Sequence, residues 1–598
     1  MWTNIELAAA LAVRTNLLLP EMETFHAAPP TAFAAAQTAL VTARGNALLD
    51  VPISNLSYAD FALYWKTGDR QTYQVPYYAR RERLLVFALL CFLQPENKRY
   101  ADALNEIVWT ICAEPFWALP AHFLTETGAD LPFCEFATQL DLFACETGFA
   151  MAEVLTLVPN TLEPMVREQA RLQVERRIFA PFLRNDITFR FENMTNNWSG
   201  VCASAIGGAA LHLLESGTAL TAILTRCLAC ENVYLSSFGD DGVCTEGVDY
   251  WTYGFGFFTC FADLLAKRTE GKCDLLALPK AQAIARSQQA FYCSGKSTVS
   301  FADGGETSHF RLGLSSYLQR RIENVTLPDE VLAAPLLEDT CYRFCLGIRD
   351  MLWAQPEASF GACAETAAWL PDAQWFLSRH DAISLIAKAG NNGESHNHND
   401  CGSFIFMQNG VPLLCDLGAG LYDAAYFGPA RYDIFVNRSG SHNVPILNGH
   451  EQAAGASFAA EDVKTSFTAQ ENTLTCELAH CYNCPSLRFF KRTLCHNFAS
   501  VNVTLTDDIH FETPAKITEV FCAHAPFVLG DGCAVVTYKT QACVLSFDAS
   551  LFDASVHAQA YIDHHANPQT AFLLHLTGKT AACDHLAAIT LTPKRSTL

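Results

Sequence analysis

The sequence predicts two domains, a helical domain followed by an antiparallel β domain, and three observations lead to this fold class. The chain has 598 residues, which exceeds the size at which a single hydrophobic core stops growing. Up to about residue 350, apolar residues recur three and four positions apart, whereas from about residue 375 the period is two. We expect the helical domain over residues 1–355, the β domain over residues 376–598, and a junction with little periodicity over residues 356–375.

Each half carries its own signals. In the first half, many successive helical segments are separated by Pro and Gly clusters, which favours paired helices in a toroid or an irregular bundle. In the second half, Asn-Gly at 409–410 and at 448–449 and Asp-Gly at 531–532 are turn signals between alternating segments such as 501–506. Short strands joined in this way predict a β-sandwich.

Composition excludes some classes of function. The formal net charge is −22, from 62 acidic and 40 basic residues, so no nucleic acid is expected as a partner, because phosphate binding needs a basic surface. The same charge favours a short anionic oligomer over a long polyanion as a ligand, and it requires local positive charge where that ligand binds. No apolar run is long enough to span a membrane, so no membrane partner is expected.

The N-terminal segment and the cysteines indicate a location. Residues 1–25 lack a basic start and a continuous apolar core, and they read as an amphipathic helix rather than a signal peptide. The 24 cysteines are scattered without a disulfide framework, which is typical of reduced, buried thiols. We expect a cytoplasmic protein, and the sequence leaves a homo-oligomeric state open.

The segment 391–416 carries the densest group of titratable side chains. Its Asn-Gly turn pairs residue 408 with 411, and counting outward places Ser403 opposite Asp416. The hairpin then brings Asp416 to the sheet end that holds His396, His398 and Asp400. Such a group can bind a divalent metal or move protons. A lone His in a strand is more often structural, but four converging groups favour a functional site.

Two segments of the helical part are further candidates. Asn196-Asn197-Trp198 precedes an apolar helix, where an Asn usually caps the backbone; alternatively its amide donates to a substrate carboxylate or a developing oxyanion. Residues 240–254 combine carboxylates, glycines and aromatic side chains, including Tyr250 and Trp251. That mixture is typical of sugar-binding clefts, although the same aromatics also suit a core.

Taken in order, these segments resemble the heparinase II/III-like polysaccharide lyases. The resemblance is strongest over about residues 190–450, and the last third of the chain is similar only in its β character. The matching residues are Asn196-Asn197-Trp198, Asp241-Gly242, Glu246-Gly247, Tyr250-Trp251-Thr-Tyr253-Gly254, His396-Asn-His398-Asn-Asp400, Gly402-Ser403-Phe404, Asp416-Leu-Gly418 and Ser441-His442-Asn443.

The resemblance implies an α/α toroid joined to an antiparallel β-sandwich. It also implies a carbon–oxygen lyase that cleaves uronic-acid-containing, glycosaminoglycan-like oligosaccharides or polysaccharides by β-elimination. On the motif match, Asn197, with help from Asn196, neutralises the uronate carboxylate. Tyr250 is then the base, the acid that protonates the leaving oxygen, or both, and His396 is the base on the opposite sugar face.

The resemblance further implies a metal and substrate contacts. Some members hold zinc in the β domain, and the matching ligands here are His398, Asp416 and His442, with a structural role expected for the metal. No organic cofactor is expected. The residues expected to contact substrate, besides the catalytic ones, are Asn196, Trp198, Glu246, Tyr253 and Arg438. Trp198 stands where many members have His, and Tyr253 lies one helical turn from Tyr250.

Two alternatives remain open at this stage. The first is a glycoside hydrolase on the same toroid, with Asp241 and Glu246 as its acid and base. The second is a non-catalytic carbohydrate-binding protein, in which the histidines form a purely structural metal site.

Overall fold

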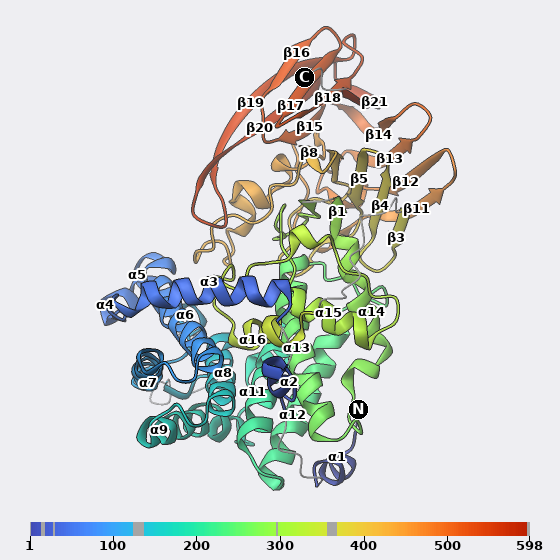
Figure 1. The fold of residues 1–598 in the computed structure, drawn as a ribbon. Coiled ribbons are helices and arrows are strands. Elements are labelled where there is room, and N and C mark those ends of the chain that lie inside the picture. Colours follow the sequence, from blue (N-terminus) through green and yellow to red (C-terminus); the bar gives the residue numbers. More distant parts are fainter. Residues whose placement is uncertain are drawn as a thin grey trace.

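The computed structural model describes residues 2–12, 18–27, 30–123, 137–294, 297–355 and 367–594. Helices make up the first part of the chain as far as Trp353, and strands make up nearly all of the regular structure from Ala367 onward (Figure 1). The predicted fold class, a helical domain followed by an antiparallel β domain, is therefore confirmed. Among the described helices, none is both long and apolar enough to cross a membrane.

The helical part contains sixteen described α-helices. Their bounds are α1 (Asn4–Leu11), α2 (Glu21–Ala27), α3 (Ala32–Leu49), α4 (Tyr58–Phe61), α5 (Leu63–Thr67), α6 (Gln71–Leu93), α7 (Lys98–Cys112), α8 (Leu142–Leu157), α9 (Pro164–Val174), α10 (Ala180–Phe182), α11 (Asn197–Leu213), α12 (Thr218–Ser236), α13 (Val248–Arg268), α14 (Pro279–Ser287), α15 (Leu312–Arg321) and α16 (Phe344–Trp353).

Helix α11 is buried along most of its length because small residues let its neighbours approach closely. It packs against α8, α12 and α13. A Cβ atom added to Gly207 would lie 2.5 Å from the Phe261 ring of α13, and one added to Gly208 would lie 2.5 Å from the Phe149 ring of α8. Any larger residue would therefore push these helices apart. This packing fixes the start of α11, where Asn197 lies.

The β part is built from antiparallel sheets. An eight-stranded sheet has the order β11-β12-β13-β14-β21-β18-β17-β16, a four-stranded sheet β19-β20-β15-β9, and a five-stranded sheet β3-β4-β5-β7-β8. Burial alternates along strands such as β12, which is the period of two seen in the sequence. The bounds are β3 (Ala367–Leu370), β4 (Trp375–His380), β5 (Ile383–Lys388), β6 (Asn391–Asn392), β7 (Phe404–Gln408), β8 (Val411–Leu414), β9 (Ile446–Leu447), β10 (Gly455–Ala459), β11 (Glu461–Phe467), β12 (Glu471–Glu477), β13 (Leu487–Asn497), β14 (Asn502–Ala515), β15 (Ile517–Ala523), β16 (Phe527–Gly530), β17 (Cys533–Tyr538), β18 (Gln541–Ser546), β19 (Phe552–Ile562), β20 (Pro568–Gly578) and β21 (Ala582–Lys594).

Between the two parts lies the segment that we expected to be a junction. Its residues 356–366 are outside the described residues. Strand β3 and the first residue of β4 fall within the remainder, so regular structure begins again before residue 376. A further short hairpin, β1 (Tyr292–Ser294) and β2 (Ser297–Thr298), lies inside the helical part.

The β7–β8 hairpin has the predicted turn but not the full predicted register. Asn409 and Gly410 both have positive φ angles, 49° and 72°, and Gln408 pairs with Val411. A bulge then shifts the ladder, because Met407 pairs with Pro412 whereas Phe406 pairs with Leu414. Proline has no N–H to donate, and it lies here on the edge strand of the sheet. The predicted pairing of Ser403 with Asp416 is therefore wrong.

Candidate active site

A cleft of about 350 Å³ lies where the helical part meets the β part. The helical part lines it with Asn197, Glu246 and Tyr250, and the β part with Glu394 and Ser395. Three of the segments singled out in the sequence thus meet at one place. They arrive from the starts of α11 and α13 and from the loop that follows β6.

At the start of α11, the two asparagines have different surroundings. The Asn196 side chain accepts a hydrogen bond from the Trp198 backbone N–H at 3.0 Å and caps the helix. Asn197 is 5% exposed, and its amide makes no hydrogen bond with any residue that the structure describes. Trp198 packs edge-on against His122, with 4.8 Å between ring centroids. The amide of Asn197 is therefore the group available to a ligand in the cleft.

Tyr250 and His396 lie against one another across the domain boundary. Their ring centroids are 4.5 Å apart. The hydroxyls of Tyr250 and Tyr422 are 2.9 Å apart, and Tyr422 donates to Asp303 Oδ2 at 2.7 Å. Burial raises the pKa of Tyr250 well above its usual value, so its hydroxyl keeps its proton near neutral pH.

Asp303 is the residue at the centre of this group, and the sequence analysis missed it. Its carboxylate contacts His396 Nδ1 at 2.5 Å and His398 Nε2 at 3.2 Å. Tyr422 and Tyr426 also donate to it. Burial alone would raise the pKa of Asp303, but the hydrogen bonds from the two histidines hold it well below its usual value. A carboxylate from the helical part thus orients two histidines of the β part.

Glycines in two of the sequence motifs explain how Asp303 reaches this position. A Cβ atom added to Gly247 would lie 2.8 Å from the Gly304 Cα, and one added to Gly418 would lie 2.5 Å from the Gly304 carbonyl oxygen. Both glycines also have positive φ angles. The loop that carries Asp303 therefore packs backbone to backbone with both motifs. The Asp303-Gly304-Gly305 run was the available signal.

Glu246, which lines the cleft, lies beside His396. Its Oε2 is 3.3 Å from His396 Nε2 and accepts no hydrogen bond within the described part of the chain. Burial raises the pKa of Glu246. For His396, burial lowers the pKa, but the contact with Asp303 and the charge of Glu246 outweigh it, so the pKa is raised. The two groups can share a proton between them.

Two residues expected to contact substrate are bound to other protein groups. Tyr253 donates to Glu146 and lies under the Arg343 guanidinium, which is 3.8 Å from the ring centroid. Arg438 makes a two-point ion pair with Glu451, with distances of 3.0 and 2.7 Å. Neither residue lines the cleft described above.

The predicted metal ligands do come together. His398, Asp416 and His442 are buried, and one ligand atom from each lies within 4.8 Å of the others. His442 Nε2 donates to the Val436 carbonyl oxygen at 3.1 Å, and its Nδ1 lies 3.1 Å from Asp416 Oδ2. His398 Nδ1 is buried and has no hydrogen-bond partner among the described residues.

This arrangement fits a divalent metal. One nitrogen of each imidazole is held by a protein acceptor while the other is directed at the group, as in protein zinc sites. Asp400, which we had placed with these histidines, instead pairs with the buried Lys388 at 2.8 Å. That ion pair holds the loop before β7.

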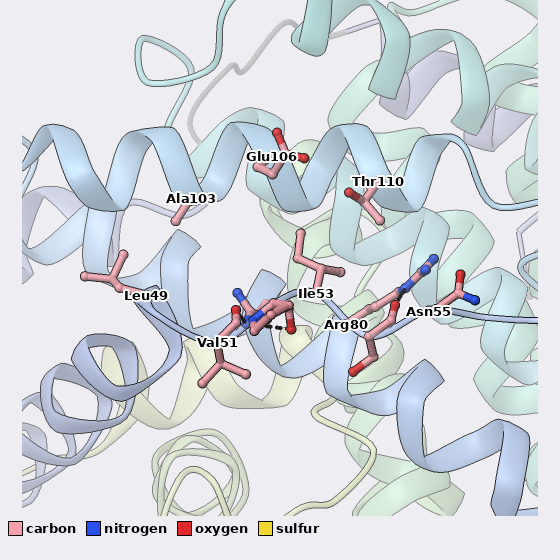
Figure 2. Close-up of a pocket in the computed structure, with 11 residues that line it drawn as sticks. Leu49, Val51, Ile53, Asn55, Arg80, Ala103, Glu106 and Thr110 are labelled. Carbon is pink, nitrogen blue, oxygen red and sulfur yellow. Dashed lines mark hydrogen bonds between the residues drawn. The ribbon is translucent and has the colours of Figure 1, made fainter.

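A second cavity, of about 460 Å³, lies between α6, α7 and the segment after α3 (Figure 2). Its two arginines are bound to the protein itself. Arg80 donates to the Ser54 carbonyl oxygen and to Glu114, and Arg83 donates to the carbonyl oxygens of Val51 and Pro52. These arginines fasten the 51–55 segment to α6, and we assign the cavity no ligand.

Comparison with known proteins shows which family model the β part matches and which solved structures share the fold. Residues 364–587 match the family model described as Heparinase II/III-like, C-terminal. The chain is similar in structure to heparinase III, with a TM-score of 0.64 and 14% identity over 98% of this chain and 94% of that one. For the heparan sulfate lyase HepC of Pedobacter heparinus, the TM-score is 0.60 and the identity 13%, over 97% and 88%.

A more distant likeness is to the chondroitin AC lyase of Streptomyces coelicolor A3, with a TM-score of 0.52 and 10% identity over 94% of this chain and 80% of that one. No curated protein matches the chain. At these identities the solved structures establish the fold. Together with the family match, they confirm the resemblance found in the sequence motifs.

Proposed function

Because residues 364–587 form a heparinase II/III-like domain within a chain that has the heparinase III fold, we propose that this protein is a polysaccharide lyase. Its substrate would be a uronic-acid-containing glycan, cleaved by β-elimination. The observation that carries the proposal is that the unpaired Asn197 amide and Tyr250 line one interdomain cleft, with the His396 imidazole packed against the Tyr250 ring.

The residue types suit the chemistry of elimination. The C5 proton of a uronate is weakly acidic, and its removal places negative charge on the carboxylate. The Asn197 amide donates to that carboxylate. Glu246 supplies a second donor when it is protonated, which its raised pKa favours. The uronate is therefore neutralised by two donors that carry no fixed charge.

Proton transfers complete the reaction. His396 takes the C5 proton through Nε2, because Asp303 holds its Nδ1 and fixes the tautomer. The C4–C5 double bond forms as the C4–O4 bond breaks. The Tyr250 hydroxyl gives its proton to O4, and the hydroxyl of Tyr422, 2.9 Å away, is placed to return one.

A metal has a supporting part in this proposal. His398, Asp416 and His442 would hold a zinc ion, which would supply a fixed link between the loop before β7 and the loop before β9. His398 and His396 share Asp303, so the metal site and the reacting histidine are held by the same carboxylate.

The hydrolase alternative is disfavoured by the surroundings of Asp241. One of its carboxylate oxygens accepts from the backbone N–H groups of Asp372 and Ala373, and the other from that of Val243. A carboxylate bound in this way is a structural cap rather than a catalytic acid. The pair of Asp241 and Glu246 that this alternative requires therefore does not supply an acid and a base for glycoside hydrolysis.

The test is ultraviolet absorbance during incubation with uronate oligosaccharides of the heparan, chondroitin, hyaluronan and alginate types. Elimination creates a conjugated double bond, so we expect absorbance to rise with at least one of them. New reducing ends without a rise in absorbance would indicate hydrolysis and refute the proposal. Binding without turnover would indicate a carbohydrate-binding protein instead.

A further inference from the structure

The cleft beside Asn197 has an unusual charge for a protein that binds an anionic glycan. The described residues that line it include Asp241, Glu246, Asp372 and Glu394, and neither Lys nor Arg is among them. The whole chain has a formal net charge of −22. An anionic substrate therefore needs a source of positive charge elsewhere along its path.

Such a source lies at Arg70, whose positive charge acts on the Tyr250 hydroxyl. This half-buried arginine precedes α6 in the helical part, and its guanidinium carbon lies 5.4 Å from the ring centroid of Phe427 in the β part. Neighbouring backbone confirms the contact between the two parts, because a Cβ atom added to Gly68 would lie 3.1 Å from the Ala424 Cβ. The Gln74 amide oxygen, in its favoured orientation, accepts from Arg70 Nε and Nη2. No described carboxylate forms an ion pair with Arg70, which leaves its Nη1 donors for a ligand.

Phe427 forms an exposed aromatic surface directly beside the catalytic group. Its side chain is 49% exposed. Its ring centroid lies 6.1 Å from that of His396 and 4.9 Å from that of Tyr422. One exposed phenylalanine is ordinary on a protein surface. This one connects the reacting histidine to an arginine, and an exposed aromatic face is the surface on which a sugar ring packs.

The hairpin of β19 and β20 also lies beside Tyr422. The β19–β20 hairpin extends from the sheets toward the helical part (Figure 1), and its tip carries His564. The His564 ring meets the Tyr422 ring edge-on, with 4.3 Å between centroids, and Asp563 forms a β-bridge with Gly420. The tip therefore lies beside the tyrosine that hydrogen-bonds to Tyr250.

We propose that Arg70, Phe427 and His564 form a second sugar-binding subsite, next to the reacting one, that holds an anionic sugar residue of the substrate. Phe427 packs against the sugar ring, Arg70 pairs with its carboxylate or sulfate group, and His564 supplies a hydrogen-bonding group at the rim. This inference rests on the proposed lyase function, since it assigns the neighbouring sugar of the same substrate.

The test separates binding from turnover. In a Tyr250→Phe background, which keeps the cleft but removes the reacting hydroxyl, calorimetric titration measures the Kd for tetrasaccharides of the panel above. We expect Arg70→Met to weaken binding about 10-fold or more, as for loss of a charge-assisted hydrogen bond. Phe427→Leu should weaken it about 5-fold. The matched control is Arg99→Met, an exposed arginine at the start of α7, which should leave the Kd unchanged.

Substrate chemistry then identifies the anion. If the effect of Arg70→Met disappears on a desulfated tetrasaccharide, Arg70 binds sulfate; if it persists, Arg70 binds a carboxylate. In the enzyme with Tyr250 restored, Arg70→Met should raise KM about 10-fold while kcat changes less than about 3-fold.

The measurements distinguish failure of the subsite proposal from failure of the proposed lyase function. Elimination by the native enzyme, with unchanged Kd and KM in both Arg70→Met and Phe427→Leu, would overturn the subsite alone. No binding and no elimination with any member of the panel would overturn both proposals. Thermal unfolding of each variant identifies misfolding, and because Phe427 is exposed, its variant tests the subsite even if Arg70→Met does not fold.

Discussion

Replacing Asp303 with Asn is the most informative single change, because that carboxylate joins the two domains and orients the reacting histidine. Its side chain is fully buried, and it contacts His396 at 2.5 Å, His398 at 3.2 Å and Tyr422 at 2.7 Å. Removing one partner of a buried charged pair typically costs about 3–5 kcal/mol. The Asn side chain keeps the volume and one acceptor oxygen, so we expect a loss of about 3 kcal/mol in the free energy of unfolding.

The loss of activity should be larger than the loss of stability explains. Without the carboxylate, the tautomer of His396 is no longer fixed and its imidazolium is not stabilised, and we expect kcat/KM to fall by roughly three orders of magnitude. Urea unfolding gives the stability, and ultraviolet absorbance with the eliminated oligosaccharide gives the activity. Elimination at the native rate in Asp303→Asn would refute the role assigned to this residue.

A matched control is available in the helical part. Asp350 is also fully buried, and it accepts from Arg311 Nη1 at 2.9 Å and from the Gly313 backbone N–H at 3.0 Å. Asp350→Asn should lower the free energy of unfolding by a similar amount but leave kcat per folded molecule within about 3-fold. An equal loss of activity in both variants would mean that Asp303 acts only through stability.

Three further predictions follow from the same geometry. Tyr250→Phe should reduce elimination at least about 1,000-fold, with a midpoint of thermal unfolding within about 2 °C of the native one; native rates would refute its role. His442→Ala should abolish the rise in unfolding temperature that added zinc produces in the native protein, and an unchanged rise would place the metal elsewhere. Burial raises the pKa of Glu146 to about 7. The protonated Glu146 therefore adds to the free energy of unfolding in full below about pH 4.5, and this contribution is lost as the pH rises through 7. Between pH 4.5 and pH 8, the free energy of unfolding of Glu146→Gln should therefore rise by about 3 kcal/mol relative to that of the native protein. Urea unfolding at a series of pH values measures this difference, and a difference that does not change with pH would contradict the prediction.

The sequence predicts those features that are encoded locally. The Asn409-Gly410 turn requires positive φ angles that these residue types adopt, and the change of period from helical to two follows from which face each element buries. The bulge between Phe406 and Met407 was not predictable by counting residues outward from the turn, because counting assumes an unbroken ladder. The strand register of a hairpin is therefore harder to predict from the sequence than the type of its turn.

The candidate site divides in the same way. Tyr250 and His396 stand in motifs, and their contact required only that the two domains meet. Asp303 stands in no motif, because its role arises from three glycine-bearing loops that lie far apart in the chain and pack together. Asn196 and Asn197 are adjacent and chemically identical, so only the helix geometry distinguishes the cap from the free amide.

In the proposed site, the charged donor and the uncharged donors contact different parts of the substrate, and this separation has a physical reason. A fixed positive charge at the reacting carboxylate would bind the substrate and the transition state nearly equally, which lowers KM without raising kcat. The donors assigned to that carboxylate, Asn197 and protonated Glu246, carry no fixed charge, and their hydrogen bonds strengthen as negative charge moves onto its oxygens. Arg70 lies away from the reacting carbon, beside Phe427, where uniform binding is useful. We infer that this chain places its charge where it holds the glycan and its uncharged donors where the bond breaks.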